Sequence, residues 1–231
     1  MSIVRTIKPP LNKAMYFNGV NAYINVASSP SLALSSQFTL MGWFLFPPGI
    51  PGGKGVVQKN PQARDYDYMF YLSTLGAPGV YFKNPAGQVF YVQLGVDYRD
   101  NRWHHWAGTF DGRYLKMYTD ATLRATTDTG GTTVRTSSTP LAIGYGWGYY
   151  VEMFSPQVLI YSRALSTSEI QHNMLNPNNP VRDSLVLWLD ARACDASKGI
   201  CYDLSGNSNH GTMYNVSIVT LPNQIAPGMV M

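Results

Sequence analysis

Short runs of alternating hydrophobic and polar residues recur along this chain, and the clearest of them lies between residues 103 and 120. Trp106, Gly108 and Phe110 share one parity before an Asp111-Gly112 pair, and alternation resumes through residues 114, 116 and 118. An Asp-Gly pair between two such runs is a strong local signal for a β-hairpin. Glycine supplies the positive φ that a primed turn requires. The pattern therefore predicts two strands joined by a tight turn at Asp111-Gly112.

The same pattern predicts strands along most of the chain from residue 14 to residue 148, and it predicts no amphipathic helix there. Runs of β-branched and aromatic residues are separated by clusters of Gly, Pro, Asn and Ser. Phe46–Gly53 and Thr126–Pro140 lack a strand pattern and are expected to be loops. The number and spacing of the strands predict an all-β fold of two antiparallel sheets packed as a sandwich. The predicted strands are Ala14–Phe17, Tyr23–Val26, Phe38–Phe46, Gly55–Lys59, Tyr68–Ser73, Gly79–Lys83, Gln88–Gln93, His104–Phe110, Tyr114–Thr119, Ala121–Thr127 and Leu141–Gly144.

One helix is predicted, near residues 166–175. Ser166 suits the N-cap position, and Glu169 stands three residues later, which is the spacing of a capping box. The helix is expected to end near Pro177, because proline cannot continue a helix.

Composition restricts the classes of partner. Charged residues make up 13% of the 231 residues, about half the usual share, and the net charge is +4 without a dense basic run. Nucleic acid is therefore not expected as the main ligand. No apolar stretch is long enough to span a bilayer, and the N-terminus has no Sec-type signal peptide, so neither membrane insertion nor Sec export of this chain is expected.

Three sequence blocks resemble the laminin-G-like branch of the concanavalin-A-like lectin and glucanase superfamily. They are residues 14–26, the predicted hairpin, and residues 158–170 with their Arg-Ala-Leu-Ser motif, and they follow in the family's order. In that family, residues 157–161 would form the last strand and the helix after it would close the domain. The resemblance implies a concanavalin-A-like jelly roll, with an N-terminal arm (1–10), a sandwich (11–176) and a C-terminal extension (177–231).

The extension resembles the opening of such a domain, although it comes last in this chain. The similar segments are Leu185–Asp190 and Cys201–Tyr214. Three arrangements are open. The tail could complete its own sandwich as a circular permutation, it could be donated to a neighbouring subunit, or it could be a truncated second repeat, which would be marginal in stability at this size.

Catalytic chemistry has little support in the sequence. Glucanase relatives use two acidic residues at short spacing, whereas Glu169 is accounted for by the capping box and Glu152 stands alone. Asp65 and Asp67 could share a strand face, but a solvated strand edge is the favoured interpretation. His104 and His105 would point to opposite faces of a strand, so they cannot jointly bind one ion. The chain is therefore predicted not to be an enzyme and to require no cofactor.

The family resemblance makes calcium the metal to consider. The family's acidic positions appear here as Asn18 and Asn21, and as Phe154-Ser155. Asp203, Ser205, Asn207 and Asn209 alternate like the start of a calcium loop, without a closing Glu. A turn rich in Asx residues is the favoured interpretation, with a calcium site as the alternative.

The two cysteines, Cys194 and Cys201, flank a loop short enough for a disulfide to close, and two free thiols are the alternative.

Aromatic residues provide the remaining candidate for a binding site. Tyr145, Trp147, Tyr149 and Tyr150 alternate with glycines at 144, 146 and 148. Flat rings of this kind suit stacking on sugars or proteins, whereas the alternative is a loop folded onto its own sandwich.

Function is predicted from these features together. The expected role is that of a non-catalytic structural or interaction protein, a self-assembling subunit of a virion or surface filament, located in a virion or at a cell surface. Its partners would be copies of itself, contacted by the N-terminal arm and the tail. The alternative is a carbohydrate-binding, lectin-like module, which would keep Tyr145, Trp147 and Tyr149 exposed around a groove.

Overall fold

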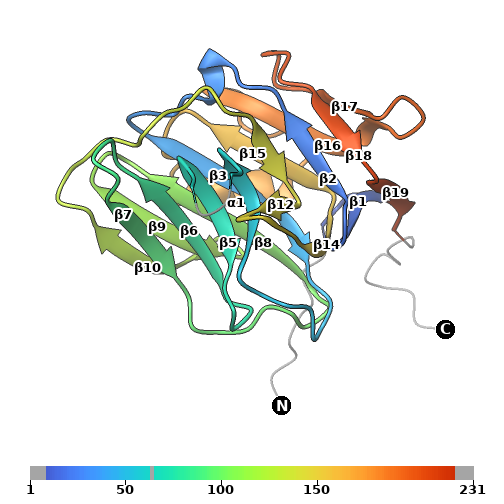
Figure 1. Cartoon of the computed structure of the whole chain (residues 1–231), viewed down its shortest axis with the longest axis horizontal. Helices are drawn as coiled ribbons and strands as arrows, with labels where there is room; N and C mark the ends of the chain where they lie inside the picture. The colour runs from blue at the N-terminus through green and yellow to red at the C-terminus, as the bar shows by residue number, and fades with distance from the viewer. Residues whose placement is uncertain (1–8, 63–64, 222–231) are drawn as a thin grey trace.

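A computed structural model describes residues 9–62 and 65–221 of the chain. The predicted arm (1–10) and the end of the tail (222–231) lie largely or wholly outside the described residues. The fold is all-β, and its antiparallel strands pair into a ladder that folds over on itself into two layers (Figure 1). The predicted all-β sandwich is confirmed, and each predicted strand is found within one residue of its expected ends.

In the described part of the chain, the first layer contains eight strands. All its neighbouring strands pair antiparallel. In spatial order they are β17 (Ile200–Asp203), β18 (Gly211–Tyr214), β2 (Tyr23–Val26), β11 (Leu141–Ile143), β4 (Lys54–Lys59), β5 (Tyr68–Leu72), β6 (Pro78–Lys83) and β7 (Val89–Gln93).

The second layer is centred on β3 (Phe38–Leu45), which pairs with β15 (Gln157–Tyr161) on one side and with β8 (Trp103–Phe110) on the other. The other strands of this layer are β9 (Tyr114–Thr119), β10 (Thr122–Asp128), β16 (Leu185–Asp195), β14 (Glu152–Ser155), β1 (Lys13–Asn18) and β19 (Ser217–Thr220). Beyond β8 follow β9 and β10, whereas β16 pairs with β15, and β1 lies between β14 and β19.

The core fills the space between the layers, because alternate residues of every strand point inward. Trp106, Phe110 and Phe70 are fully buried there together with aliphatic side chains from both layers. The Asp111 hairpin forms between β8 and β9, but its two central residues are Gly112 and Arg113 rather than Asp111 and Gly112. Gly112, with φ +99°, is the first of the two, which is where a primed turn of the Gly-first form places it.

Helix α1 (Thr167–Leu175) covers the outer face of the second layer. Its N-terminus has the predicted capping box, in which the Ser166 hydroxyl accepts from the Glu169 N–H and the Glu169 carboxylate accepts from the Ser166 N–H. Ile170 belongs there to a buried hydrophobic cluster that also contains Met41, Leu159 and Trp188 of the sheet. A 3-10 turn, η1 (Pro30–Leu32), follows β2.

The C-terminal extension is part of the sandwich of its own chain. β16 pairs with β15, β18 pairs with β2, and β19 pairs with β1, so that strands from the two ends of the sequence lie side by side (Figure 1). β16 also pairs with β17 and thereby links the two layers. The segment therefore supplies strands to the sandwich in cis.

Candidate binding surface

The aromatic segment forms a small hairpin on the outer face of the first layer. Strand β12 (Tyr145–Gly146) pairs with β13 (Tyr149–Tyr150), and β12 lies against β4. A Cβ added to Gly55 would approach the Gly146 Cα to 2.9 Å, so glycine at these positions lets the two backbones touch. The hairpin is thus held directly against the sheet.

The four predicted aromatic residues have different environments. The Trp147 ring packs on Tyr71 of β5 with a centroid separation of 4.8 Å and also contacts Tyr66, and its buried indole N–H has no partner among the described residues. Tyr149 is 59% exposed, whereas Tyr145 and Tyr150 are half-buried and pack on each other. Trp147 is therefore folded onto the sandwich and anchors the hairpin, whereas Tyr149 is presented to solvent.

Tyrosines on the underlying strands extend this aromatic surface in both directions. Tyr81 of β6 and Tyr91 of β7 are register partners whose rings stack at 5.2 Å, and Tyr91 is 54% exposed. On the other side, Tyr23 of β2 stacks on Tyr214 of β18. We call this surface the tyrosine face, and it comprises Tyr23, Tyr66, Tyr71, Tyr81, Tyr91, Tyr145, Trp147, Tyr149, Tyr150 and Tyr214.

Burial affects the ionisation of three tyrosines in the tyrosine face. Burial raises the pKa of Tyr66 to about 12, although Arg135 opposes the shift, and burial also raises the pKa of Tyr81 and Tyr71. The Tyr81 hydroxyl donates to the Gln93 side chain. Tyr66, Tyr71 and Tyr81 therefore keep neutral hydroxyl groups at physiological pH, and the surface as a whole offers apolar ring faces beside hydroxyls.

Sequence reasoning found the hairpin and missed the strand tyrosines. A signal was present, because Tyr81 and Tyr91 lie on correctly predicted strands at the alternate positions that point away from the core. Alternation within a strand does not reveal which strands are neighbours in the sheet, so the continuity of the face could not be inferred.

The residues considered for calcium form a hydrogen-bonded turn. The Asp203 carboxylate accepts from the backbone N–H groups of Trp188, Ser205 and Asn209 and from the Ser205 hydroxyl, at 2.7–3.0 Å. Asn209 binds Ser29, Ser31 and the Val186 carbonyl, and the Asn207 amide donates to the Leu185 carbonyl. Because both Asp203 oxygens face donors, this set does not fit a calcium site; no cluster of three His, Cys, Asp or Glu residues suited to a metal occurs in residues 9–62 and 65–221.

The two acidic residues at 65 and 67 precede β5 and form ion pairs instead of lying along a solvated strand edge. Asp67 is 1% exposed, and its carboxylate binds Arg135 at 3.2 Å and the Ser137 hydroxyl at 2.6 Å. Burial would raise the pKa of Asp65, but hydrogen bonds from Arg135 and Lys83 hold it at about 2. The predicted solvated edge is therefore wrong for Asp67, and Arg135 was the partner that sequence reasoning missed.

The two histidines lie on opposite sides of β8, as adjacent strand residues must. His105 is 1% exposed against Trp43, and burial lowers its pKa to about 4 despite the Asp120 carboxylate. His104 lies between Asp120 and Asp100, with nitrogen–oxygen distances of 3.2 and 3.3 Å. Burial alone would lower the pKa of His104, but these carboxylates raise it.

The two glutamates contact different residues. Glu169 binds Arg163 at 2.6 Å, and the hydrogen bonds from Arg163, which outweigh burial, lower its pKa to about 2. Glu152 on β14 lies at the limit of hydrogen bonding from the Tyr16 hydroxyl, at 3.5 Å.

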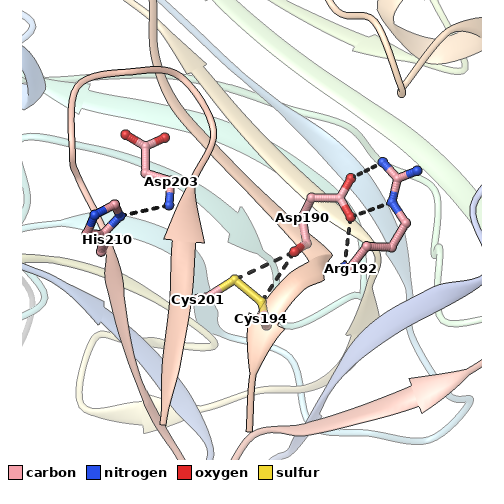
Figure 2. The surroundings of a disulfide bond; sticks show 6 residues. All are labelled: Asp190, Arg192, Cys194, Cys201, Asp203 and His210. Carbon is pink, nitrogen blue, oxygen red and sulfur yellow. Dashed lines mark hydrogen bonds and ion pairs between the residues drawn. A yellow bond between two sulfur atoms is a disulfide. The ribbon is translucent and has the colours of Figure 1, made fainter. Parts of the chain in front are cut away.

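A disulfide joins Cys194 of β16 to Cys201 of β17 (Figure 2). The two cysteines are register partners, and Cys201 is fully buried. Beside them, Arg192 makes a bidentate ion pair with the buried Asp190 carboxylate. On the adjoining strand, the Asp203 N–H donates to His210 (Figure 2). The bond therefore fastens the hairpin that connects the two layers.

No helix in the described part of the chain is long and apolar enough to cross a membrane.

Comparison with solved structures places this architecture among known folds. A Bacteroides ovatus protein, described as a "putative carbohydrate binding protein", aligns with 94% of this chain at a TM-score of 0.67 and 21% identity. The binding domain of Paraclostridial Mosquitocidal Protein 1 follows at a TM-score of 0.56, 16% identity and 68% of this chain, and the heptameric pentraxin from Limulus polyphemus at 0.52, 14% and 71%. The alignments span 62%, 41% and 82% of those chains, respectively, so the present chain covers less than two thirds of the first two.

Comparison with curated protein sequences finds no match. A laminin-G family model does match residues 18–171, and it is described as the concanavalin A-like lectin/glucanases superfamily. This match covers most of both layers and ends within α1, whereas the strands of the extension that complete the sandwich lie outside it. Sequence motifs, two-layer topology and the family model agree, and the chain belongs to the concanavalin A-like lectin/glucanases superfamily.

Proposed function

We propose that this protein is a lectin-like module that binds carbohydrate through the tyrosine face. The observation that carries the proposal is the presentation of Tyr149, Tyr91 and Tyr214 to solvent, with 59, 54 and 43% exposure, on one face of one layer. Two of these rings are held by stacking on a neighbouring tyrosine, so little side-chain freedom would be lost on binding.

A sugar fits this chemistry better than a charged polymer. Tyrosine combines an apolar ring face with a hydroxyl, and a pyranose matches these with its C–H face and its own hydroxyls. The hydroxyls and amides beside the rings, such as Gln93, Asn25 and Thr212, suit a neutral ligand. The carbohydrate binding named for the Bacteroides ovatus neighbour supports the same ligand class.

Binding without catalysis is the second part of the proposal. Retaining glycosidases hold two carboxyl groups about 5 Å apart, with one free to act as an acid. Here Asp65, Asp67 and Glu169 are tied to arginines. These ion pairs support a role for the carboxylates in structure.

The test is a glycan array followed by titration calorimetry with the best ligand. Tyr149→Ala and Tyr91→Ala are each expected to weaken binding about tenfold, because each removes an exposed stacking ring. Tyr114→Ala is the matched control, since Tyr114 on β9 is also exposed (38%) but belongs to the other layer. Binding that survives both face variants, or is lost equally in the control, would contradict the proposal.

The self-assembling subunit predicted from the sequence, in a virion or surface filament, stays a prediction. Its partners would be copies of this chain, and solution mass by light scattering is the measurement that decides it. A large assembly broken by Tyr149→Arg would mean that the tyrosine face contacts a second copy, whereas a monomer would leave the lectin-like role.

A further inference from the structure

A groove of about 530 Å³ opens where the loop after β2 meets the loop before β11. Five hydroxyl side chains line it, and Pro30 and Ala33 provide the remaining wall. Its volume lies within the range of small-molecule sites. None of the tyrosines of the tyrosine face lines it. The five hydroxyls belong to Ser28, Ser29, Thr136, Ser137 and Ser138.

Two of these hydroxyls donate a hydrogen bond to another residue of the protein, and the other three can donate to a ligand. The Ser29 hydroxyl donates to Asn209 Oδ1, and the Ser137 hydroxyl donates to Asp67 Oδ2, both at 2.6 Å. In the described part of the chain, the hydroxyls of Ser28, Thr136 and Ser138 donate to no protein acceptor. The groove therefore presents hydrogen-bond donors without carboxylates in its lining.

A buried cation lies directly behind this wall. Lys59 is fully buried, and its ammonium group donates to Ser28 Oγ and to the Ser137 carbonyl, each at 3.1 Å, and to the Thr139 carbonyl. Three acceptors match the three protons of an ammonium ion. Because Ser28 Oγ accepts from a cation, its own O–H becomes a stronger donor toward the groove.

The positive charge of Lys59 has no direct counter-ion. Among residues 9–62 and 65–221, no carboxylate lies within 4 Å of the Lys59 Nζ atom. The nearest candidate, Asp67, is paired with Arg135 and Ser137. Burial lowers the pKa of Lys59, and Asp67 offsets only part of that shift. An uncompensated buried cation is costly, and an anion near it would reduce that cost.

We propose that the groove is a second binding site, which takes a carboxylate or sulfate group of a small ligand. The anion accepts hydrogen bonds from the hydroxyls of Ser28 and Ser138, and the ammonium of Lys59 acts on it through Ser28. An oxygen bound to Ser28 would lie about 5–6 Å from the cation, a distance at which a partly buried pair is weakly screened. The site shares no residue with the tyrosine face, so this proposal is tested independently of the proposed function.

The test is titration calorimetry of the full chain with sodium glucuronate and with sodium sulfate, and glucose serves as the neutral probe. Binding of either anion without binding of glucose is expected, and the comparison of the two anions distinguishes a carboxylate ligand from a sulfate ligand. Ser28→Ala/Ser138→Ala should weaken anion binding about tenfold or more, because each change removes a hydrogen bond to a charged acceptor. Equal binding of glucose, or no anion binding at all, would overturn the proposal.

A matched control is the double variant Ser35→Ala/Ser36→Ala. Both serines are exposed and lie outside the groove lining. This variant should bind the anion as the wild type does. Sulfate also stabilises folded proteins in general, and the change in the unfolding temperature of this variant when sulfate is added measures that general effect. Equal loss in the two double variants would also overturn the proposal.

Lys59→Met tests the role of the charge. The variant keeps an unbranched side chain of similar length, and circular dichroism reports whether the sandwich is retained. Anion binding should disappear in a folded Lys59→Met protein, and unchanged binding would contradict the role of the cation. If the variant does not fold, the serine pair alone decides.

Discussion

Tyr23 and Tyr214 stack with their ring centroids 4.6 Å apart and their planes within 9° of each other. One ring belongs to β2 near the N-terminus and the other to β18 in the C-terminal extension, and the two residues are register partners. The extension therefore supplies both a strand of the first layer and part of the tyrosine face. Fold and proposed binding surface depend on the same long-range pairing.

Truncation tests this dependence. A chain ending at Pro180 would lose β16–β19, uncover the edges of β2, β1 and β15, and remove Leu187 and Leu189 from the core. It is expected to aggregate or to lose cooperative unfolding, as measured by light scattering and circular dichroism.

A chain ending at Leu221 is the control, because it keeps β19 and the Leu221 N–H bond to the Asn12 carbonyl. It should unfold like the full chain. A monomeric 1–180 chain with the unfolding temperature of the full chain would show that residues 11–176 fold without the extension.

Asp203 is predicted to stabilise the fold and not to bind calcium. Asp203→Asn replaces one acceptor oxygen with an amide that cannot accept from the N–H groups facing it. We expect a loss of about 1–3 kcal/mol in the free energy of unfolding, measured in urea. A chelator should leave the unfolding temperature of the wild type unchanged, and a clear decrease on chelation would instead support a calcium site.

We expect the protein to lose stability on mild acidification, because His105 is buried in its neutral form. Its pKa in the folded protein, about 4, lies below the ordinary value of 6.5, so the unfolded chain binds the proton more readily. The stabilisation is complete above pH 6.5 and decreases as the pH falls toward 4, by about 2 kcal/mol between pH 6.5 and 5.

The measurement is the free energy of unfolding between pH 7 and 5 for the wild type and for His105→Phe. The variant should have a flatter profile, since Phe does not titrate. Asp65 and Glu169 have pKa values of about 2 in the folded protein. Their contribution to stability is lost only when the pH falls below the ordinary pKa of a carboxyl group, so it does not affect the comparison between pH 7 and 5. An identical slope in the variant would show that His105 is not responsible.

The disulfide is expected to contribute modestly to stability. Cys194 and Cys201 are separated by 7 positions, and closing so short a loop stabilises by about 2–3 kcal/mol in the chain-entropy model. Cys194→Ser/Cys201→Ser should lower the free energy of unfolding by that amount in oxidising buffer. A reducing agent should affect the wild type and leave the variant unchanged; a response in both would point to a different cause.

Local sequence determined the elements of this protein. Strand positions follow from alternation, and the helix follows from Ser166 and Glu169, which lie three residues apart and interact across a single turn. The reversal at Gly112 was visible for the same reason, although the hydrogen bonds of Asp111 moved the centre of the turn by one residue. Signals of this kind are complete within a few residues of the chain.

Tertiary structure decided what the elements build. The tyrosine face exists because β2 and β18 pair and because β12 lies on β4, and the environment of Asp67 depends on Arg135, which comes from a distant loop. The groove likewise joins two loops around Lys59, which reads in sequence as an ordinary strand residue. Strand order and burial follow from the sum of many weak contacts over the whole chain, and no short window of sequence contains them.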